Sequence, residues 1–134
     1  DVGMADPNAL TVAVSAANAV HQIGMPEAKI ILAEAVVYMA TAPKSNASYM
    51  GLEKAMSAVQ NTKILGIPVH LMDAHYKGAA KLGHGDGYKY AHDYENHYVN
   101  QQYLPDELVN EVFYNPGDLG YEVKVKEHFK KIKG

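Results

Sequence analysis

The sequence contains no cysteine, which excludes a disulfide framework, thiol catalysis and zinc sites built on thiolates. It contains no arginine either, since all twelve basic residues are lysines. Without the planar guanidinium fork, bidentate recognition of guanine or phosphate is lost, so sequence-specific reading of duplex DNA is not expected. A formal net charge of −3 argues against a broadly basic nucleic-acid surface, but it is compatible with a local basic patch.

The sequence also lacks an apolar run long enough for a membrane span, and no signal peptide opens it. We therefore expect a cytoplasmic protein that has no membrane partner. With 134 residues, 48% of them hydrophobic and 20% charged, the chain 1–134 is expected to be a single globular domain. Because it starts at Asp1 without an initiator methionine, we expect a piece excised from a larger protein.

What the sequence does contain is a strongly apolar segment, Met25 to Ala42, around which the other elements must pack. Wound as a helix, it places Glu27, Glu34 and Thr41 in one narrow stripe and leaves apolar side chains around most of the circumference. Such a helix needs protein on most sides, from this chain or from another copy. Our candidate residues for an oligomer interface, on this helix and the next, are Val36, Val37, Met39 and Met50.

Helix start and stop signals predict an all-α fold. The helices expected besides the central one are about Pro7–Gln22, Asn46–Thr62, Ala74–Leu82 and Tyr121 to the C-terminus, with a helical turn in Pro105–Val109. The last of them also alternates as a strand does over its first residues. In the first helix, His21 falls on the apolar side and is interpreted as a core or interface residue. The predicted inner stripe of the third helix is Tyr49, Leu52, Ala55, Met56 and Val59.

A long segment, Gly83 to Gln102, is rich in glycine, tyrosine and histidine and has no helical periodicity. Tyrosines at this density bury area and need hydrogen-bond partners, so we expect an ordered loop. Its opening Gly83–Gly87 lacks the lysine and the Ser/Thr ending of a nucleotide P-loop. We interpret these glycines instead as positions of positive φ or of close approach by another segment.

The same loop offers imidazole and carboxylate groups that suit zinc, manganese or iron. These groups are His84, Asp86, His92, Asp93 and His97. Their spacing matches no helix-borne ligand pair, and histidines that bond to the loop's own backbone explain the pattern as well. A metal-dependent hydrolase therefore stays an alternative, and no catalytic, cofactor or metal-binding residue is assigned.

Lysines and tyrosines alternate from Tyr76 to Tyr90. Lysine attracts phosphate without regard to sequence, and tyrosine can stack on unpaired bases, so the combination suits a single-stranded nucleic-acid-binding module. The candidate contacts are Lys77, Lys81, Tyr88, Lys89 and Tyr90. The competing interpretation is that the tyrosines pack and the lysines keep the loop soluble.

Several long motifs resemble a known family. The segments DVGMADPNAL, HQIGMPEAKIILAEAVVYMATAPKSN and above all DAHYKGAAKLGHGDGYKYAHDY followed by QQYLPD are similar to the C-terminal region of the RarA or MgsA family of AAA+ ATPases, which is related to the Werner-helicase-interacting protein. The similarity covers nearly the whole chain.

This resemblance implies a helical domain like the collar of clamp-loader subunits, which holds the parent ATPase together as a homotetramer. ATP and magnesium belong to an upstream module outside this chain, so the fragment itself is not expected to be an enzyme or to bind a cofactor. The parent is expected to act in DNA replication, recombination and repair at stalled forks or gaps, with DNA and replication proteins as partners. An oligomerisation domain is thus our first hypothesis.

Overall fold

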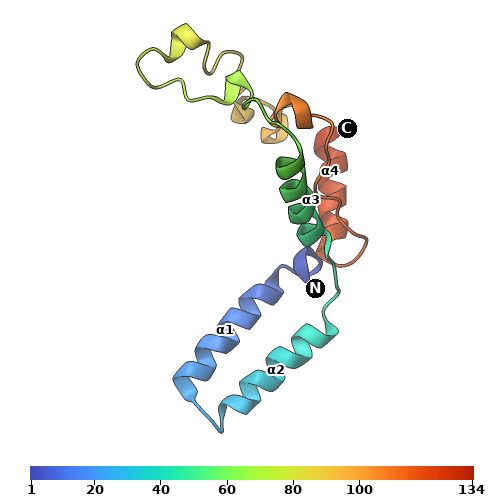
Figure 1. Cartoon of the computed structure of the whole chain (residues 1–134). Coiled ribbons are helices and arrows are strands. Elements are labelled where there is room, and N and C mark those ends of the chain that lie inside the picture. The colour runs from blue at the N-terminus through green and yellow to red at the C-terminus, as the bar shows by residue number, and fades with distance from the viewer. The chain divides into compact units, whose positions relative to one another are not determined.

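The computed structural model describes residues 1–134 and contains four α-helices and six short 3-10 helices, with no strand. The all-α prediction is therefore confirmed. The chain packs as two compact units: unit 1 comprises Asp1–Leu52 with Tyr114–Phe129, and unit 2 comprises Glu53–Phe113 with Lys130–Gly134 (Figure 1). No helix combines the length and apolarity that crossing a membrane requires.

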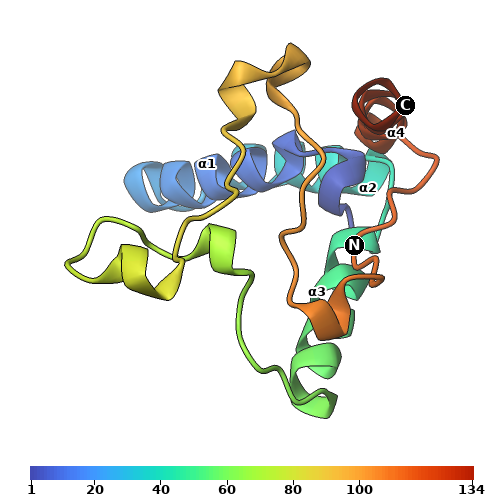
Figure 2. The ribbon, with the colours of Figure 1, turned by 90° about the horizontal axis from the view of Figure 1, so that it is seen from above.

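Unit 1 is built on a hairpin of two helices, α1 (Asn8–Ile23) and α2 (Ala28–Thr41), that run side by side in Figures 1 and 2. Both lie close to their predicted ranges. The carboxylate of Asp6 accepts the N–H of Asn8 at 3.1 Å, as expected at a helix start. Gly24 ends α1 with a φ of +76°, a conformation that glycine adopts without strain.

The C-terminal helix α4 (Tyr121–Lys133) begins in unit 1, so the helical interpretation of this segment is correct. Its second residue, Glu122, is fully buried. The carboxylate accepts hydrogen bonds from the Tyr114 hydroxyl at 3.0 Å and the Gly117 N–H at 2.7 Å, and also from the Ser45 hydroxyl. Glu122 thus ties the start of α4 to the linker between α2 and α3.

Close backbone contacts hold the N-terminus of unit 1 in place. Gly120 has a φ of +56°, and a Cβ at this position would lie only 2.0 Å from the carbonyl oxygen of Ala5. The N–H of Ser45 donates to the carbonyl of Asp1 at 2.8 Å. Only glycine can occupy position 120, because both its φ and the available space exclude a side chain.

Helix α3 (Ala47–Asn61) contributes to both units. The predicted inner stripe is wrong for its large residues, because Tyr49, Leu52, Met56 and Val59 are all exposed in this chain. The covered face carries small side chains instead: Gly51 is buried and Ala55 is half-buried. Helical periodicity correctly grouped these apolar residues on one face of α3, but it did not show that this face is exposed in this chain.

The rest of unit 2 consists of irregular chain with 3-10 turns, which are η2 (Val69–Leu71), η3 (Ala79–Leu82), η4 (Ala91–Asp93), η5 (Glu95–His97) and η6 (Asp106–Leu108). The expected helix Ala74–Leu82 is therefore wrong for its first half. Gly78 has a φ of +94°, which breaks the helical path, and Asp73 caps a local turn by accepting the N–H of His75 at 2.9 Å. The turn predicted within Pro105–Val109 is present as η6.

Candidate functional site

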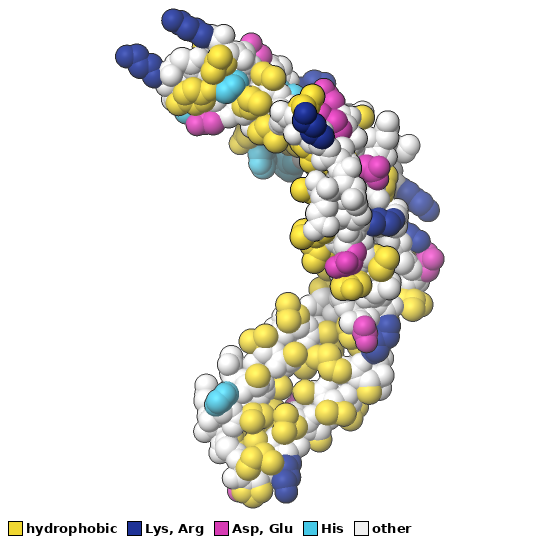
Figure 3. Space-filling view, viewed as in Figure 1, with side chains coloured by type: hydrophobic (Ala, Val, Ile, Leu, Met, Phe, Trp, Pro, Cys, Tyr) yellow, Lys and Arg dark blue, Asp and Glu magenta, His cyan; other side chains and the backbone are white.

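The hairpin of unit 1 exposes a continuous set of apolar side chains. Helical periodicity groups them on one face, hereafter the hairpin face: Leu10, Val14, Ala17, Leu32 and Val36. Leu10 is 74% exposed and Val36 64%. Figure 3 shows hydrophobic side chains gathered over both helices of the hairpin. The five side chains carry no polar atom, so the face is suited to burial against protein.

The opposite face of the hairpin has a different character. A groove of about 330 Å³ runs between the helices, and its lining includes the polar residues Thr11, Ser15 and Glu34 beside alanines and two aliphatic residues. Glu34 belongs to the polar stripe predicted for the central helix. This groove therefore carries polar side chains that the residues of the hairpin face do not have.

The predicted interface residues are not equally available. Val36, Val37 and Met50 are exposed, whereas Met39 is half-buried, on the side of α2 that carries the buried Ala28. His21 is exposed beside Leu10 and Val14, so a place in the core of this chain is wrong for it, while a place in an interface stays a prediction.

The buried core of the chain is small. The buried apolar residues are Ala5, Ala9, Ala28, Ala79, Val99 and Leu108, four of them alanines. Two separate compact units, each of half the 14.6 kDa mass, would expose about 8,300 Å² together. The chain exposes 9967 Å². Roughly 1,600 Å² more surface is thus left in water than compact packing predicts.

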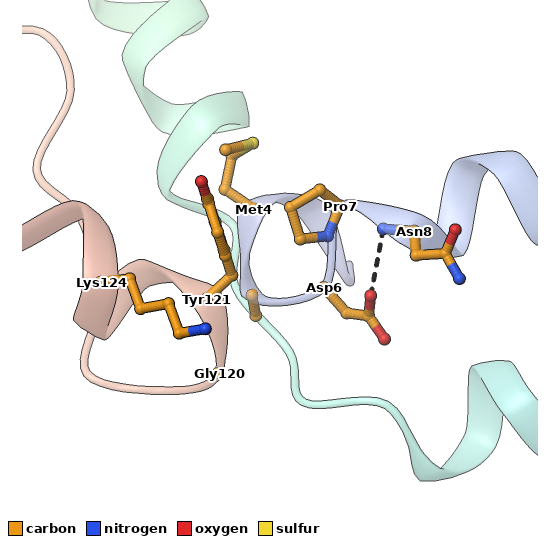
Figure 4. Close-up of a pocket in the computed structure, with 8 residues that line it drawn as sticks. Met4, Asp6, Pro7, Asn8, Gly120, Tyr121 and Lys124 are labelled. Atoms are coloured by element: carbon orange, nitrogen blue, oxygen red, sulfur yellow. Dashed lines mark hydrogen bonds between the residues drawn. The ribbon is translucent and has the colours of Figure 1, made fainter.

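A pocket of unit 1 lies beside the start of α1 (Figure 4). Its volume is about 710 Å³, and its lining includes Asp6, Tyr121 and Lys124. Asp6 is already engaged, because it accepts the hydroxyl of Tyr38 at 2.7 Å as well as the N–H of Asn8. The hydrogen bond to Asp6 raises the pKa of Tyr38. This polar cluster joins α2 to the start of α1, and its residues have structural partners rather than free catalytic groups.

The loop of unit 2 is ordered by hydrogen bonds and ring contacts. Gly85 donates its N–H to the carbonyl of Val69 at 2.9 Å, and a Cβ on Gly85 would lie 2.8 Å from Ala74. Close approach by another segment was the predicted role of these glycines, and it is confirmed at this position. The Tyr76 hydroxyl hydrogen-bonds Nδ1 of His84, and the two rings meet edge to face.

The predicted nucleic-acid contacts of this loop, Lys77, Lys81, Tyr88, Lys89 and Tyr90, are all exposed and all belong to unit 2. In the same part of the space-filling view, lysines, histidines and hydrophobic or tyrosine side chains lie on the visible face (Figure 3). Gln101 pairs with both backbone groups of Lys89: it accepts the N–H at 3.1 Å and donates to the carbonyl at 2.8 Å. This contact fixes the backbone between two exposed tyrosines.

The imidazole and carboxylate groups of the loop do not form a metal site. Nowhere in the chain do three or more such side chains come together in a group that could hold a metal ion. His92 packs against the rings of Tyr90 and His97, with centroids 5.1 and 4.9 Å apart. The geometry therefore gives no support to the metal-dependent hydrolase.

Sequence reasoning missed Gln101 and Tyr103 in the loop, and Leu10, Val14 and Leu32 in the hairpin. The hairpin residues carried a usable signal, since they form one helical stripe, but a stripe is normally assigned to the core of its own chain. The contact between Gln101 and Lys89 has no local sequence signal, because the two residues are twelve positions apart in irregular chain.

Comparison with known proteins identifies the family. The family model described as "MgsA AAA+ ATPase C terminal" matches residues 1–133. The chain is 48% identical over 133 residues to an uncharacterized AAA domain-containing protein of Mycobacterium tuberculosis, covering 99% of this chain and 29% of that protein. It is 42% identical over 133 residues to the replication-associated recombination protein A of Bacillus subtilis, covering 98% and 32%.

A eukaryotic relative matches as well. The chain is 35% identical over 115 residues to the ATPase WRNIP1 of Dictyostelium discoideum, which covers 85% of this chain and 13% of that protein. The chain thus spans about a third or less of the length of these relatives. The matched region is the C-terminal one and not the ATPase module. The chain belongs to the MgsA family of AAA+ ATPases, of which it represents the C-terminal domain.

Proposed function

We propose that this domain assembles copies of its parent ATPase into a homo-oligomer, most simply a homotetramer. The observation that carries the proposal is the hairpin face, where Leu10, Val14 and Val36 lie in water although each favours burial by about 1.5–3 kcal/mol. Covering such a face with protein is favoured by the hydrophobic effect. The occupant we propose is a second copy of this chain, because the hairpin face is aliphatic and self-complementary in chemistry.

The amount of surplus surface supports an assembly with more than one contact per chain. A standard interface covers about 800 Å² on each partner, so a surplus of roughly 1,600 Å² suffices for two of them. Closed tetramers commonly use two different patches, each of which pairs with its own copy about a two-fold axis. The exposed stripe on α3, formed by Tyr49, Leu52, Met56 and Val59, is the second patch we propose.

The relatives support a role for the parent, since one of them is named for replication-associated recombination. We propose that the parent acts in the cytoplasm in DNA replication, recombination and repair, with DNA and replication proteins as partners. Its upstream module, outside this chain, binds ATP and magnesium. In this scheme the C-terminal domain contributes no catalysis, and it sets how many ATPase modules are held together and how far apart they lie.

The test is the solution mass of the 134-residue chain and of two charged variants, measured by sedimentation equilibrium. The wild-type chain is expected to have four times the mass of one copy. Leu10→Glu is expected to shift this mass toward lower oligomers, because it places charge in the hairpin face. Position 10 lies in the first turn of α1, where a carboxylate is favourable, so the helix itself is preserved.

Gln22→Glu is the matched control, since it adds the same charge to an exposed site on the polar side of α1, outside the hairpin face. It is expected to leave the mass unchanged. Val36→Glu repeats the test from α2. A wild-type chain that stays monomeric at high micromolar concentration would refute the proposal, and equal effects of Leu10→Glu and Gln22→Glu would show that the added charge acts by general repulsion.

A further inference from the structure

We infer that the loop of unit 2 is a binding platform for the unpaired bases of single-stranded nucleic acid, formed by Tyr88, Tyr90 and Tyr103 around Gln101. This inference goes beyond the proposed oligomerisation and does not depend on it. All residues involved lie in unit 2. The three rings are each about half exposed, at 51%, 55% and 53%.

The backbone geometry orients two of the rings. Gln101 contacts both the N–H and the carbonyl of Lys89, and these two groups of one residue point the same way when the chain is extended. Tyr90 is extended as well, with φ −77° and ψ 112°. Alternate side chains of an extended segment share one side, so Tyr88 and Tyr90 leave the backbone on the same side, with Cα atoms about 6.7 Å apart. This spacing is close to twice the 3.4 Å rise of stacked bases, roughly the room that one base needs between two rings.

Gln101 also places the third ring. Its Nε2 donates to the hydroxyl of Tyr103 at 3.0 Å, in addition to its bond with Lys89. A groove of about 520 Å³ adjoins this contact, and Gln101, Tyr103, Tyr98 and Asn100 line it. Aromatic faces beside amide donors and acceptors are the groups that stack on bases and bond to their edges.

Ring contacts with the two histidines that follow in the chain hold Tyr90 in place. Tyr90 packs on His92, which packs on His97. His97 has a φ of +52° and Asn96 a φ of +55°, which are costly for residues with side chains and persist only where the surrounding contacts fix them. A pre-ordered ring loses little freedom when a ligand stacks on it, so rigidity strengthens binding.

The lysines of this region lie at or before the start of the platform. The segment 74–90 carries three lysines, Lys77, Lys81 and Lys89, against one carboxylate, Asp86, whereas residues 91–103 carry two carboxylates, Asp93 and Glu95, and no lysine. Unit 2 as a whole has eight lysines and eight acidic residues, whereas unit 1 has four lysines and seven acidic residues. The net charge of −3 is therefore located in unit 1, and the platform is on the neutral unit, where a positive excess is confined to residues 74–90.

These features point to nucleic acid rather than to a peptide. A proline-rich peptide would use the tyrosines but would gain nothing from the three lysines of residues 74–90. Duplex DNA hides the faces of its bases and is read by groups that this chain lacks, above all arginine. Single strands offer both open bases and phosphates, which matches the two kinds of side chain present.

The first experiment measures fluorescence anisotropy of a labelled oligothymidine titrated with the 134-residue chain at low salt. Saturable binding is expected, tighter than binding of a duplex of equal length. Tyr90→Leu is expected to weaken binding by a factor of roughly 5 to 150, because one base–aromatic stack contributes about that factor. Tyr90→Phe keeps the ring and is expected to bind like the wild-type chain. Tyr121→Leu removes an exposed tyrosine of unit 1 and is expected to have no effect.

The second experiment separates stacking from charge through the salt dependence. Three lysine contacts give a log–log slope of about −2 for single strands, and replacing Lys77, Lys81 and Lys89 by glutamine is expected to flatten it. Gln101→Ala removes the hydrogen bonds to the Lys89 backbone and to the Tyr103 hydroxyl but no charged side chain. It is expected to weaken binding while it leaves the slope unchanged, a signature that loss of a phosphate contact would not give.

Clear results would overturn the inference. These are absence of oligothymidine binding at low salt, equal affinity for the duplex, equal losses in Tyr90→Leu and Tyr90→Phe, or saturable binding of a proline-rich peptide in place of the oligonucleotide. Helix content and solution mass are measured for every variant. If the loop substitutions change the oligomer mass, the tyrosines serve assembly and the platform is refuted, whereas loss of assembly through Leu10→Glu leaves it untouched.

Discussion

The hairpin of unit 1 and the loop of unit 2 both leave large side chains in water, but the chemistry of the two surfaces differs. The hairpin face is aliphatic and lies on regular helices, whose side chains need only shape and exclusion of water to pair. The loop presents tyrosines with polar tips among lysines, fixed by amide contacts such as that of Gln101 with Lys89. Aliphatic surfaces favour permanent partners, whereas aromatic and charged ones favour ligands that exchange.

The difference extends to how each unit is stabilised. Unit 1 has a fully buried carboxylate, Glu122, with three hydrogen-bond donors around it. Unit 2 depends on many weaker contacts at its surface, and its buried apolar residues are only Ala79, Val99 and Leu108. A local perturbation of unit 1 should therefore be large and concentrated, while unit 2 should respond gradually.

The largest effect is expected from Glu122→Ala. Removing the carboxylate leaves the Tyr114 hydroxyl and the Gly117 N–H without their acceptor, which is expected to lower the free energy of unfolding by about 2–4 kcal/mol. Urea unfolding followed by circular dichroism measures the loss. Glu127→Ala, an exposed site on the same helix, is the control and is expected to stay within about 0.5 kcal/mol of the wild type. Hydrogen exchange is expected to accelerate in unit 1 and not in the loop of unit 2.

The next effect concerns the second proposed patch. Met56→Glu and Leu52→Glu place charge on two exposed sites of this patch, and the expected result is a halved solution mass, from tetramer to dimer, because the hairpin contact persists. Ser57→Glu adds the same charge to an exposed polar site of α3 outside the patch and is expected to leave the mass unchanged. A tetramer that survives both patch substitutions would exclude this patch from the interface.

A smaller effect is expected from pH, through the same cluster around Glu122. Burial by itself raises the pKa of Glu122, but the hydrogen bonds from Ser45, Gly117 and Tyr114 outweigh it, so the pKa is lowered. A lowered folded-state pKa means that the carboxylate stabilises the fold above the unfolded value of about 4.3 and loses this contribution as pH falls through the folded value. The stability difference between wild type and Glu122→Gln is therefore expected to shrink in acid.

Tyr114 gives the matching test in alkali. Burial, followed by the hydrogen bond to Glu122, raises its pKa to about 12. The neutral hydroxyl therefore stabilises the fold fully below the ordinary tyrosine value of about 10, and this contribution is lost as pH rises toward 12. Tyr114→Phe is expected to reduce the alkaline part of the pH dependence, to which Tyr38 also contributes, as measured by urea unfolding between these values. An unchanged alkaline profile in this variant would contradict the assignment.

The sequence predicted regular elements well, because their signals are local. Asp6 before α1, Gly24 after it and the apolar period of α2 are each visible within a few residues of the element they bound. The failures have a common cause, which is that burial depends on partners distant in the sequence. The stripe with Leu52 and Met56 was assigned inward, yet it is exposed in this chain, and Glu122 was not recognised as buried because its donors come from separate segments.

In the loop of unit 2, too, contacts between residues distant in the sequence could not be predicted. Composition correctly indicated that glycines there permit close approach, as at Gly85, and that tyrosines and lysines share one segment. The pairing of Gln101 with Lys89 depends on the fold of irregular chain, for which no periodicity exists. The sequence thus predicted which residue types the candidate platform contains, whereas their positions relative to one another are known only from the structure.

The smallest effect is expected from ATP, which neither surface should recognise. The chain has no Walker motif, and the hairpin face has no group that binds phosphate. One adenine stacked on a tyrosine of the loop gains about 1–3 kcal/mol, which is weaker than the roughly 4.1 kcal/mol of a millimolar complex. Millimolar ATP with magnesium is therefore expected to stabilise the chain by less than about 0.4 kcal/mol and to release no phosphate, as measured by thermal unfolding and a phosphate assay. Lys89→Gln is the control, since it removes the lysine that lies two residues after the loop glycine Gly87. A stabilisation of the wild-type chain that survives repurification would contradict the prediction. Loss of that stabilisation in Lys89→Gln would place the nucleotide at the loop.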